Sequence, residues 1–185
     1  MAIDSGCRQG ELLALLWTDF DARTGTMSVT KALANRNGKL SVKEVKTKKS
    51  RRMVVLSFSL EALARHRDRM RTEGWDVEAG PIFPNTEGGY VAKGNLRKRH
   101  FNPTLQRARV PTIRYHDLRH CCASLMLAAG VDCKVVSERL GHATPGFTAN
   151  TYQHVLPGLQ AQAAERLKTI LTPLAKPHMG QQMAG

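Results

Sequence analysis

The sequence predicts a mainly α-helical α+β domain with a small three-stranded antiparallel sheet near residues 26–56. Apolar residues at helical spacing, bounded by capping residues and glycines, indicate helices before the sheet and again after it. Alternating apolar residues on both sides of the turn signal 35–38 indicate the strands. A chain of 185 residues is long enough to bury one ordinary core.

The first helix is expected to run from Arg8 to Leu16 and to be short and buried. Arg8 lies at its beginning, where backbone amides and the positive end of the helix dipole would add to the guanidinium in holding an anion. Glu11, one turn later, could orient Arg8 or a neighbouring imidazole. The alternative for Glu11 is a plain surface acid.

The expected strands are the runs 27–30, 40–45 and 53–56. A basic turn, residues 46–52, separates the last two. Because a lysine side chain is long and flexible, a lysine on this turn could reach a phosphate. The alternative is a solvated charge run that contacts phosphates without specificity.

Helical patterns cover most of the remaining chain, at 60–72, 93–109, 115–129, 132–140, 144–157 and 158–171. Asp132 is a candidate N-cap, and Gly130 and Gly141 are candidate C-terminal caps. In the helix 115–129, His116 and Arg119 fall roughly 60° apart around the axis. The apolar residues expected on its opposite, packed face are Leu118, Cys121, Cys122, Leu125 and Ala129.

The formal net charge of +13 is typical of a protein that binds nucleic acid, although an RNA-binding or ribosomal protein would have the same charge. The four cysteines show no metal-binding spacing and are expected to be reduced thiols in a cytosol. No apolar run approaches the roughly 18 residues of a membrane helix, so no membrane partner is expected. Residues 173–185 have little apolar content and are expected to be a disordered tail.

Six residues in chain order resemble the signature of the tyrosine recombinase (phage integrase) family, which reads Arg, Lys, His-x-x-Arg, His or Trp, and Tyr. The matching residues are Arg8, Lys46, His116, Arg119, His142 and Tyr152. His142 stands in a Leu-Gly-His box, and Tyr152 follows it by ten residues. The resemblance, which runs from about residue 5 to about residue 157, implies an integrase-type catalytic domain over residues 1–172. It also implies that this domain is shortened at its N-terminus and lacks the family's core-binding domain.

The resemblance also implies a chemistry. Tyr152 would attack a DNA phosphodiester and form a 3′-phosphotyrosine, which another strand's 5′ hydroxyl could then reverse. Arg8, Arg119 and His142 would hold the phosphate oxygens. Lys46, preferred over Lys48 and Lys49, would protonate the leaving 5′ oxygen, and His116 would help to take the tyrosine proton. Neither a metal nor a nucleotide cofactor is implied.

The implied partners are double-stranded DNA attachment sites, other copies of the chain in a tetramer on DNA, and accessory DNA-bending or directionality factors. The implied location is the cytoplasm, in association with the nucleoid, for a protein encoded by a bacterium or a phage. The terminal helix 158–171 could dock on a neighbouring protomer or on its own domain.

Three other interpretations stay open from sequence. One is a catalytically inactive fragment that binds DNA without specificity, and another is relaxation of DNA as in a type IB topoisomerase. The third is a zinc site, because His116 and His120 are four residues apart, although no third ligand is apparent.

Overall fold

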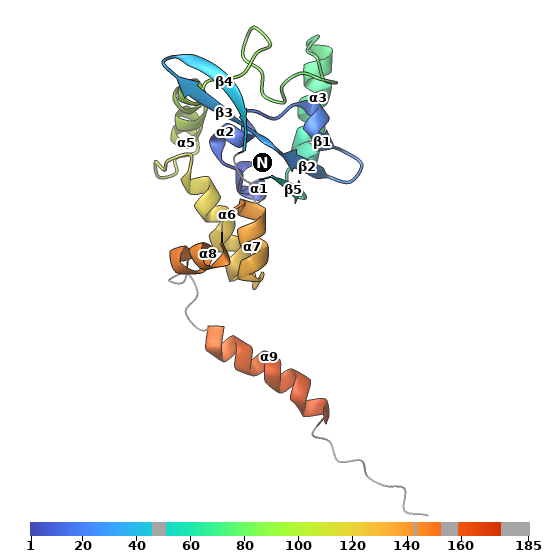
Figure 1. Ribbon diagram of the computed structural model, residues 1–185, viewed down its shortest axis with the longest axis vertical. Helices are drawn as coiled ribbons and strands as arrows, with labels where there is room; N and C mark the ends of the chain where they lie inside the picture. Colours follow the sequence, from blue (N-terminus) through green and yellow to red (C-terminus); the bar gives the residue numbers. More distant parts are fainter. Residues whose placement is uncertain (46–50, 143, 153–158, 175–185) are drawn as a thin grey trace, which may run out of the picture.

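The computed structural model describes residues 1–45, 51–142, 144–152 and 159–174. A part that contains the strands and the first helices lies beside a group of later helices (Figure 1). The helices before residue 90 are α1 Ala2–Ser5, α2 Gln9–Leu12 and α3 Leu60–Thr72. The later helices are α4 Lys93–Asn95, α5 Asn102–Arg107, α6 Asp117–Ala128, α7 Cys133–Leu140, α8 Pro145–Tyr152 and α9 Leu159–Leu174. A π-helical stretch, Leu96–Phe101, joins α4 to α5.

The described strands form two antiparallel sheets. A three-stranded sheet has the order β1-β2-β5, with strands Phe20–Asp21, Thr26–Val29 and Arg52–Val55. A separate hairpin contains β3 Lys31–Arg36 and β4 Lys39–Glu44. The predicted small sheet is therefore present, but the run 40–45 pairs with β3 instead of joining it. The reason is local: Asn37 and Gly38 have φ angles of 50° and 80°, and such a two-residue turn pairs its own flanking residues.

Most predicted helix ends agree with the structure. The Asp132 carboxylate accepts a hydrogen bond from the Lys134 amide at 2.7 Å, and Gly141 adopts a left-handed conformation with φ 66°. The start of α3 has no capping hydrogen bond from the side chain at its N-cap. Ser59 occupies its N-cap position, but the carboxylate of Asp4 on α1 accepts the Ser59 amide hydrogen at 2.9 Å. The predicted end at Pro157 and the tail from residue 175 lie outside the described residues.

The predicted division of α6 into a packed apolar face and an opposite face that carries His116 and Arg119 is wrong in part. The periodicity places Leu125 among the packed residues, yet it is 60% exposed, whereas Arg119 is only 3% exposed. The cause is that α6 packs against α1. At this contact the Arg119 side chain donates a hydrogen bond to the backbone carbonyl of Gly6. Part of the polar side of the helix is therefore buried.

Separate apolar clusters support the two parts of the domain. Residues of α2, the sheet and α3 form one cluster, which includes Leu12, Leu15, Trp17, Met27, Val29, Val54, Leu56, Leu63 and Met70. Residues of α6, α7 and α8 form another, which consists of Cys122, Ala123, Leu127, Val136, Leu140 and Tyr152. Tyr90 and Tyr115 are partly buried against the core. Tyr152 thus lies in the helical core itself.

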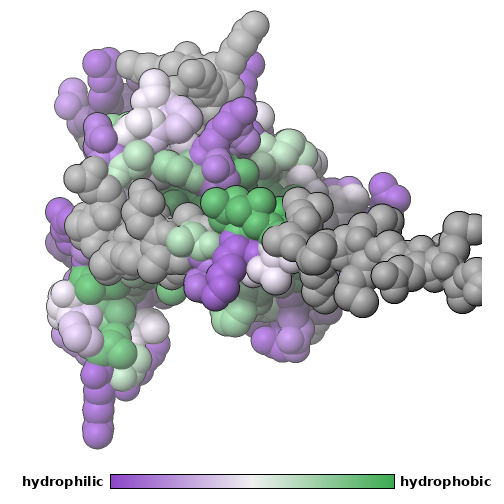
Figure 2. All heavy atoms as spheres, turned by 90° about the horizontal axis from the view of Figure 1, so that it is seen from below, coloured by the Kyte–Doolittle hydropathy of each residue, from purple (hydrophilic) through white to green (hydrophobic). Residues whose placement is uncertain are grey.

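Helix α9 extends away from the group α6–α8 (Figure 1). Its side chains Leu167, Ile170 and Leu171 are 56%, 64% and 50% exposed, at the spacing of one helical face. Viewed from the α9 side, hydrophobic residues interrupt the charged surface (Figure 2). The described part of α9 therefore leaves its apolar face uncovered. Among the described helices, none is long and apolar enough to cross a membrane.

Gly6 ends α1 in a left-handed conformation with φ 64°. A Cβ atom there would lie 2.6 Å from Leu140 Cδ2 and 3.0 Å from Cys122 Sγ, both in the helical core. Gly74 has a φ of 80° but nothing within 4 Å of such an atom. We expect Gly6→Ala to lower the free energy of unfolding by about 1–3 kcal/mol more than Gly74→Ala, because only the first overpacks the core. Urea denaturation would measure this, and equal losses would contradict the packing at the α1–α6 contact.

Candidate active site

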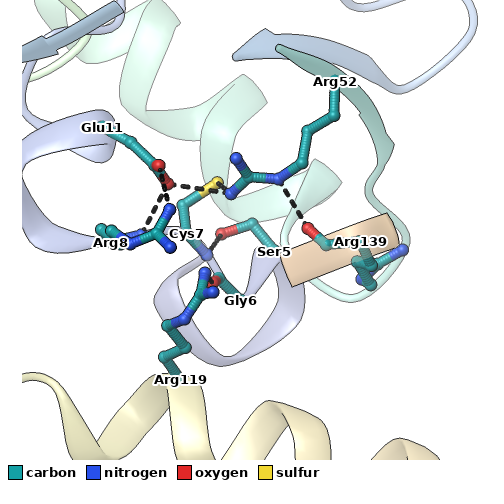
Figure 3. A network of polar contacts seen from close by, with 8 residues as sticks. All are labelled: Ser5, Gly6, Cys7, Arg8, Glu11, Arg52, Arg119 and Arg139. Atoms are coloured by element: carbon teal, nitrogen blue, oxygen red, sulfur yellow. Dashed lines mark hydrogen bonds and ion pairs between the residues drawn. The ribbon is translucent and has the colours of Figure 1, made fainter. Parts of the chain in front are cut away.

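The Glu11 carboxylate lies at the centre of a buried network of charged groups (Figure 3). It is 2% exposed and pairs with Arg8 Nη1 through Oε1 and with Arg52 Nη2 through Oε2, each at 2.8 Å. Burial acts to raise the pKa of Glu11, but the hydrogen bonds from Arg52 and Arg8 outweigh it and the pKa is lowered. Glu11 therefore stays ionised and orients Arg8, as one of the two sequence interpretations proposed.

Arg52 connects this network to a distant part of the chain. Its side chain is 6% exposed, and its Nε donates to the carbonyl of Arg139 near the end of α7 at 2.6 Å. Its Nη2 also lies 3.4 Å from the sulfur of Cys7. Strand β5, the start of α2 and the end of α7 are thereby held together around one guanidinium.

Arg119 comes to the same network from α6 (Figure 3). Its Nη1 donates to the Gly6 carbonyl at 2.7 Å, whereas its buried Nη2 has no hydrogen-bond partner among the described residues. Burial, followed by the charge of Arg8, lowers the pKa of Arg119 to about 10. Because an unsatisfied buried donor is costly, Nη2 is a position where a ligand oxygen would be stabilising.

His142 follows Gly141 at the end of α7 and contacts α8. Its Nδ1 lies 2.7 Å from Thr148 Oγ1, which is fully buried. Burial first, and then the positive charges of Arg119, Arg8 and Arg52, lower the pKa of His142 to about 4. His142 is therefore a neutral imidazole near pH 7, and it lies within the field of the same arginines.

Tyr152 is the last residue of α8 and is 3% exposed. Its hydroxyl is hydrogen-bonded to His120 Nδ1 at 2.8 Å. Burial raises the pKa of Tyr152, although the charge of Arg119 partly opposes this rise. The ring of His116 lies edge-on to that of His120, with 5.0 Å between centroids. Burial, and then the charges of His120, Arg119 and Arg8, lower the pKa of His116.

Five of the six predicted residues thus lie in or around one site: Arg8, His116, Arg119, His142 and Tyr152. The sixth, Lys46, lies outside the described residues, as do Lys48 and Lys49. Sequence reasoning missed Arg52, Thr148 and His120. The sequence signals for them were the position of Arg52 at the end of the basic turn 46–52 and that of His120 one helical turn after His116.

The arrangement is a cluster of cationic side chains in the neighbourhood of a tyrosine hydroxyl. The guanidinium groups of Arg8 and Arg52 pair with the carboxylate of Glu11, and the guanidinium of Arg119 lies within the electrostatic field of that carboxylate. Among the described residues no three His, Cys, Asp or Glu side chains are grouped as metal ligands. Such a cluster is suited to bind a phosphate group with the oxygen of a tyrosine nearby.

Comparison with known proteins identifies the family. Residues 1–158 match the model of the phage integrase family, and the chain belongs to this family. A "Tyrosine recombinase XerC-like" protein of Caldanaerobacter subterraneus is 36% identical over 188 residues, which cover 92% of this chain and 48% of that protein. The ICEBs1 integrase of Bacillus subtilis is 28% identical over 183 residues, again 92% of this chain and 48% of that protein. The chain therefore spans about half the length of these curated relatives.

Solved structures of tyrosine recombinases share the fold. The Tn1549 transposon integrase in complex with circular intermediate DNA matches with a TM-score of 0.75 at 20% identity, over 90% of this chain and 56% of that chain. The XerA recombinase matches with a TM-score of 0.65 at 21% identity, over 95% of this chain and 55% of that chain. The predicted mainly helical integrase-type fold is confirmed.

An NMR titration of His142 would test the electrostatic field at the site. We expect NMR to give His142 a pKa of about 4, and we expect Arg8→Gln to raise it because one nearby positive charge is removed. Since the folded state disfavours the protonated imidazole, the unfolded state binds more protons between the ordinary histidine pKa and about 4. The contribution of His142 to stability is therefore complete above this window and falls as the pH is lowered through it.

The matched control is Arg36→Gln, which removes the same charge at the exposed end of β3 and should leave the His142 titration unchanged. An ordinary pKa for His142 that neither variant alters would contradict the proposed field.

Proposed function

We propose that this chain is the catalytic domain of a site-specific DNA recombinase, which cleaves and rejoins DNA strands through a phosphotyrosine intermediate. The observation that carries the proposal is the buried Nη2 of Arg119, which has no hydrogen-bond partner among the described residues and lies at a site with more positive than negative charge. A scissile phosphate would supply both the missing acceptor and the missing negative charge. The nucleophile, Tyr152, lies in the same electrostatic field.

The described side chains would have different roles in binding the phosphate. Arg8, of which the side chain is 43% exposed, and Arg119 would donate to the nonbridging oxygens, where charge builds up in the transition state. His142 is neutral, and the Thr148 hydroxyl would donate to its Nδ1. The remaining Nε2–H of His142 would then be a third donor to the phosphate. Glu11 and Arg52 would position Arg8 without touching the DNA.

The bond changes would be a transesterification. Tyr152 Oη would bond to phosphorus as the bond to the 5′ oxygen breaks, and Lys46 would protonate that oxygen. Attack by a 5′ hydroxyl of another strand would reverse the step and complete the exchange. The DNA partner is supported by the Tn1549 integrase, of which the matching structure contains circular intermediate DNA.

We also propose that the complete protein acts as a homo-oligomer, a tetramer on its DNA sites, with accessory DNA-bending or directionality factors as further partners. The support for assembly is α9, where Leu167, Ile170 and Leu171 are at least half exposed on one face. An apolar helix face is stable when it is buried against another surface, and a second copy of the chain would supply one.

Covalent trapping would test the chemistry. The substrate would be a library of nicked duplexes with a randomised central region, so that many candidate target sequences are sampled at once. We expect a protein–DNA adduct on a denaturing gel that Tyr152→Phe abolishes, since phenylalanine has no nucleophilic oxygen. Arg119→Ala should reduce adduct formation by about 10²–10³-fold, because one donor to the developing charge is lost.

The matched control is Tyr90→Phe, which removes the hydroxyl of a packing tyrosine and should leave the adduct unchanged. An adduct that persists in Tyr152→Phe would refute the assignment of the nucleophile. If the unmodified chain binds DNA but yields no adduct anywhere in the library, it is a DNA-binding fragment without the proposed activity.

The assembly proposal is tested on α9. We expect the double variant Leu167→Asp, Ile170→Asp to abolish concentration-dependent self-association in analytical ultracentrifugation, because burying the two carboxylates in an apolar contact is costly. The control variant Thr169→Asp, Thr172→Asp adds the same charge to the opposite face and should still associate. Equal behaviour of the two double variants would argue against contact through the apolar face.

A further inference from the structure

We infer that His120 is a catalytic residue of this site and accepts the phenolic proton of Tyr152 during cleavage. The inference rests on the proposed function and revises one role within it. The family resemblance assigns help with this proton to His116, whereas the structure places the ring nitrogen of His120 against the nucleophile.

The geometry is that of a general base. Tyr152 Oη and His120 Nδ1 are 2.8 Å apart, within the range required for direct proton transfer. The two ring centroids are 5.8 Å apart. Both side chains come from helices packed in one core, α6 and α8, so their relative position is fixed by the fold.

The nucleophile needs such an acceptor. Burial raises the pKa of Tyr152 above its ordinary value, and the nearby charge of Arg119 offsets this only in part. The phenol is therefore protonated at neutral pH, and its proton must leave as the bond to phosphorus forms. Among the described residues, the hydrogen-bond partner of this hydroxyl is His120.

His116 occupies a different place. It lies at the N-cap position of α6, one turn before His120, and its side chain is exposed. Its ring meets His120 edge-on with an interplanar angle of 89°. His116 thus borders the proton acceptor and faces the open side of the site.

The step is balanced. The O–H bond of Tyr152 breaks, its proton passes to His120 Nδ1, and its oxygen bonds to phosphorus. The bond from phosphorus to the 5′ oxygen breaks, and that oxygen takes a proton from Lys46. In the reverse step an attacking 5′ hydroxyl returns a proton to Lys46, and the imidazolium of His120 returns its proton to the departing Tyr152 oxygen.

The first experiment compares adduct formation by His120→Asn and His120→Ala on the nicked-duplex substrate that traps the unmodified chain. Asparagine places an oxygen near the position of Nδ1, so it can keep the hydrogen bond but cannot take the proton. We expect both variants to be slower by about 100-fold or more. A 5′-bridging phosphorothiolate, of which the sulfur leaves without a proton, should not restore either variant.

The outcomes separate the possible roles. A normal rate for His120→Asn would mean that His120 only positions the tyrosine, and restoration by sulfur would mean that it serves the leaving group. A normal rate for both His120 variants together with a large loss for His116→Asn would return the role to His116. Each of these results would overturn the inference while leaving Tyr152→Phe as the separate test of the proposed function.

A second measurement needs no DNA and no activity. If Tyr152 donates to His120 Nδ1, the neutral imidazole must carry its proton on Nε2, which ¹⁵N chemical shifts of the ring report. We expect this tautomer to be dominant in the unmodified chain and to lose its dominance in Tyr152→Phe. A His120 ring protonated on Nδ1 in both proteins would overturn the inference even if the chain cleaves no DNA.

Discussion

The buried carboxylate of Glu11 is the group on which the rest of the site depends. It is 2% exposed and holds the guanidinium groups of Arg8 and Arg52 at equal distances of 2.8 Å. Buried ion pairs contribute little net stability, but the loss of one partner leaves an uncompensated buried charge and typically costs about 3–5 kcal/mol. We therefore interpret the pairing as a device for orientation. It fixes Arg8 at the start of α2, and through Arg52 and the Arg139 carbonyl it also fixes the end of α7.

In the free protein this site has positive charge and a hydrogen-bond donor that a bound phosphate would satisfy. Among the described residues, positive charge exceeds negative charge at the site, and one buried nitrogen of Arg119 lacks an acceptor. Burial, and then the same field, lowers the pKa values of His116 and His142, so both imidazoles stay neutral without DNA. Donors that are already aimed at the anion need little reorganisation during the reaction, which is how such sites stabilise developing charge. The favourable packing of the folded chain offsets the repulsion among these positive charges.

Local signals in the sequence predicted most helices and most residues of the candidate site. Asp132 and Gly141 mark the ends of α7 because capping depends on one residue and its immediate neighbours. The partner of β4 was not predicted, although the turn at Asn37 and Gly38 was visible, because pairing was assigned from apolar runs and β3 is less apolar. Arg52 and His120 were missed for another reason. Arg52 meets Glu11 across 41 residues and His120 meets Tyr152 across 32, and no periodicity encodes such contacts.

Polar contacts position the proposed phosphate site, apolar packing positions Tyr152, and helix α6 contributes a residue to each. The proposed phosphate site is held by charged and polar contacts among α2, β5 and α7, whereas Tyr152 is held by apolar packing of α8 on α6 and α7. Successive residues of α6 belong to each: Arg119 reaches the Gly6 carbonyl, and His120 meets the Tyr152 hydroxyl. Neighbouring positions on a helix point about 100° apart, so one rigid element can serve both sites at once. A small rotation of α6 would therefore misalign the phosphate donor and the proton acceptor together. The alignment of nucleophile and phosphate thus depends on the packing of this helix against α1, where Gly6 allows the close approach.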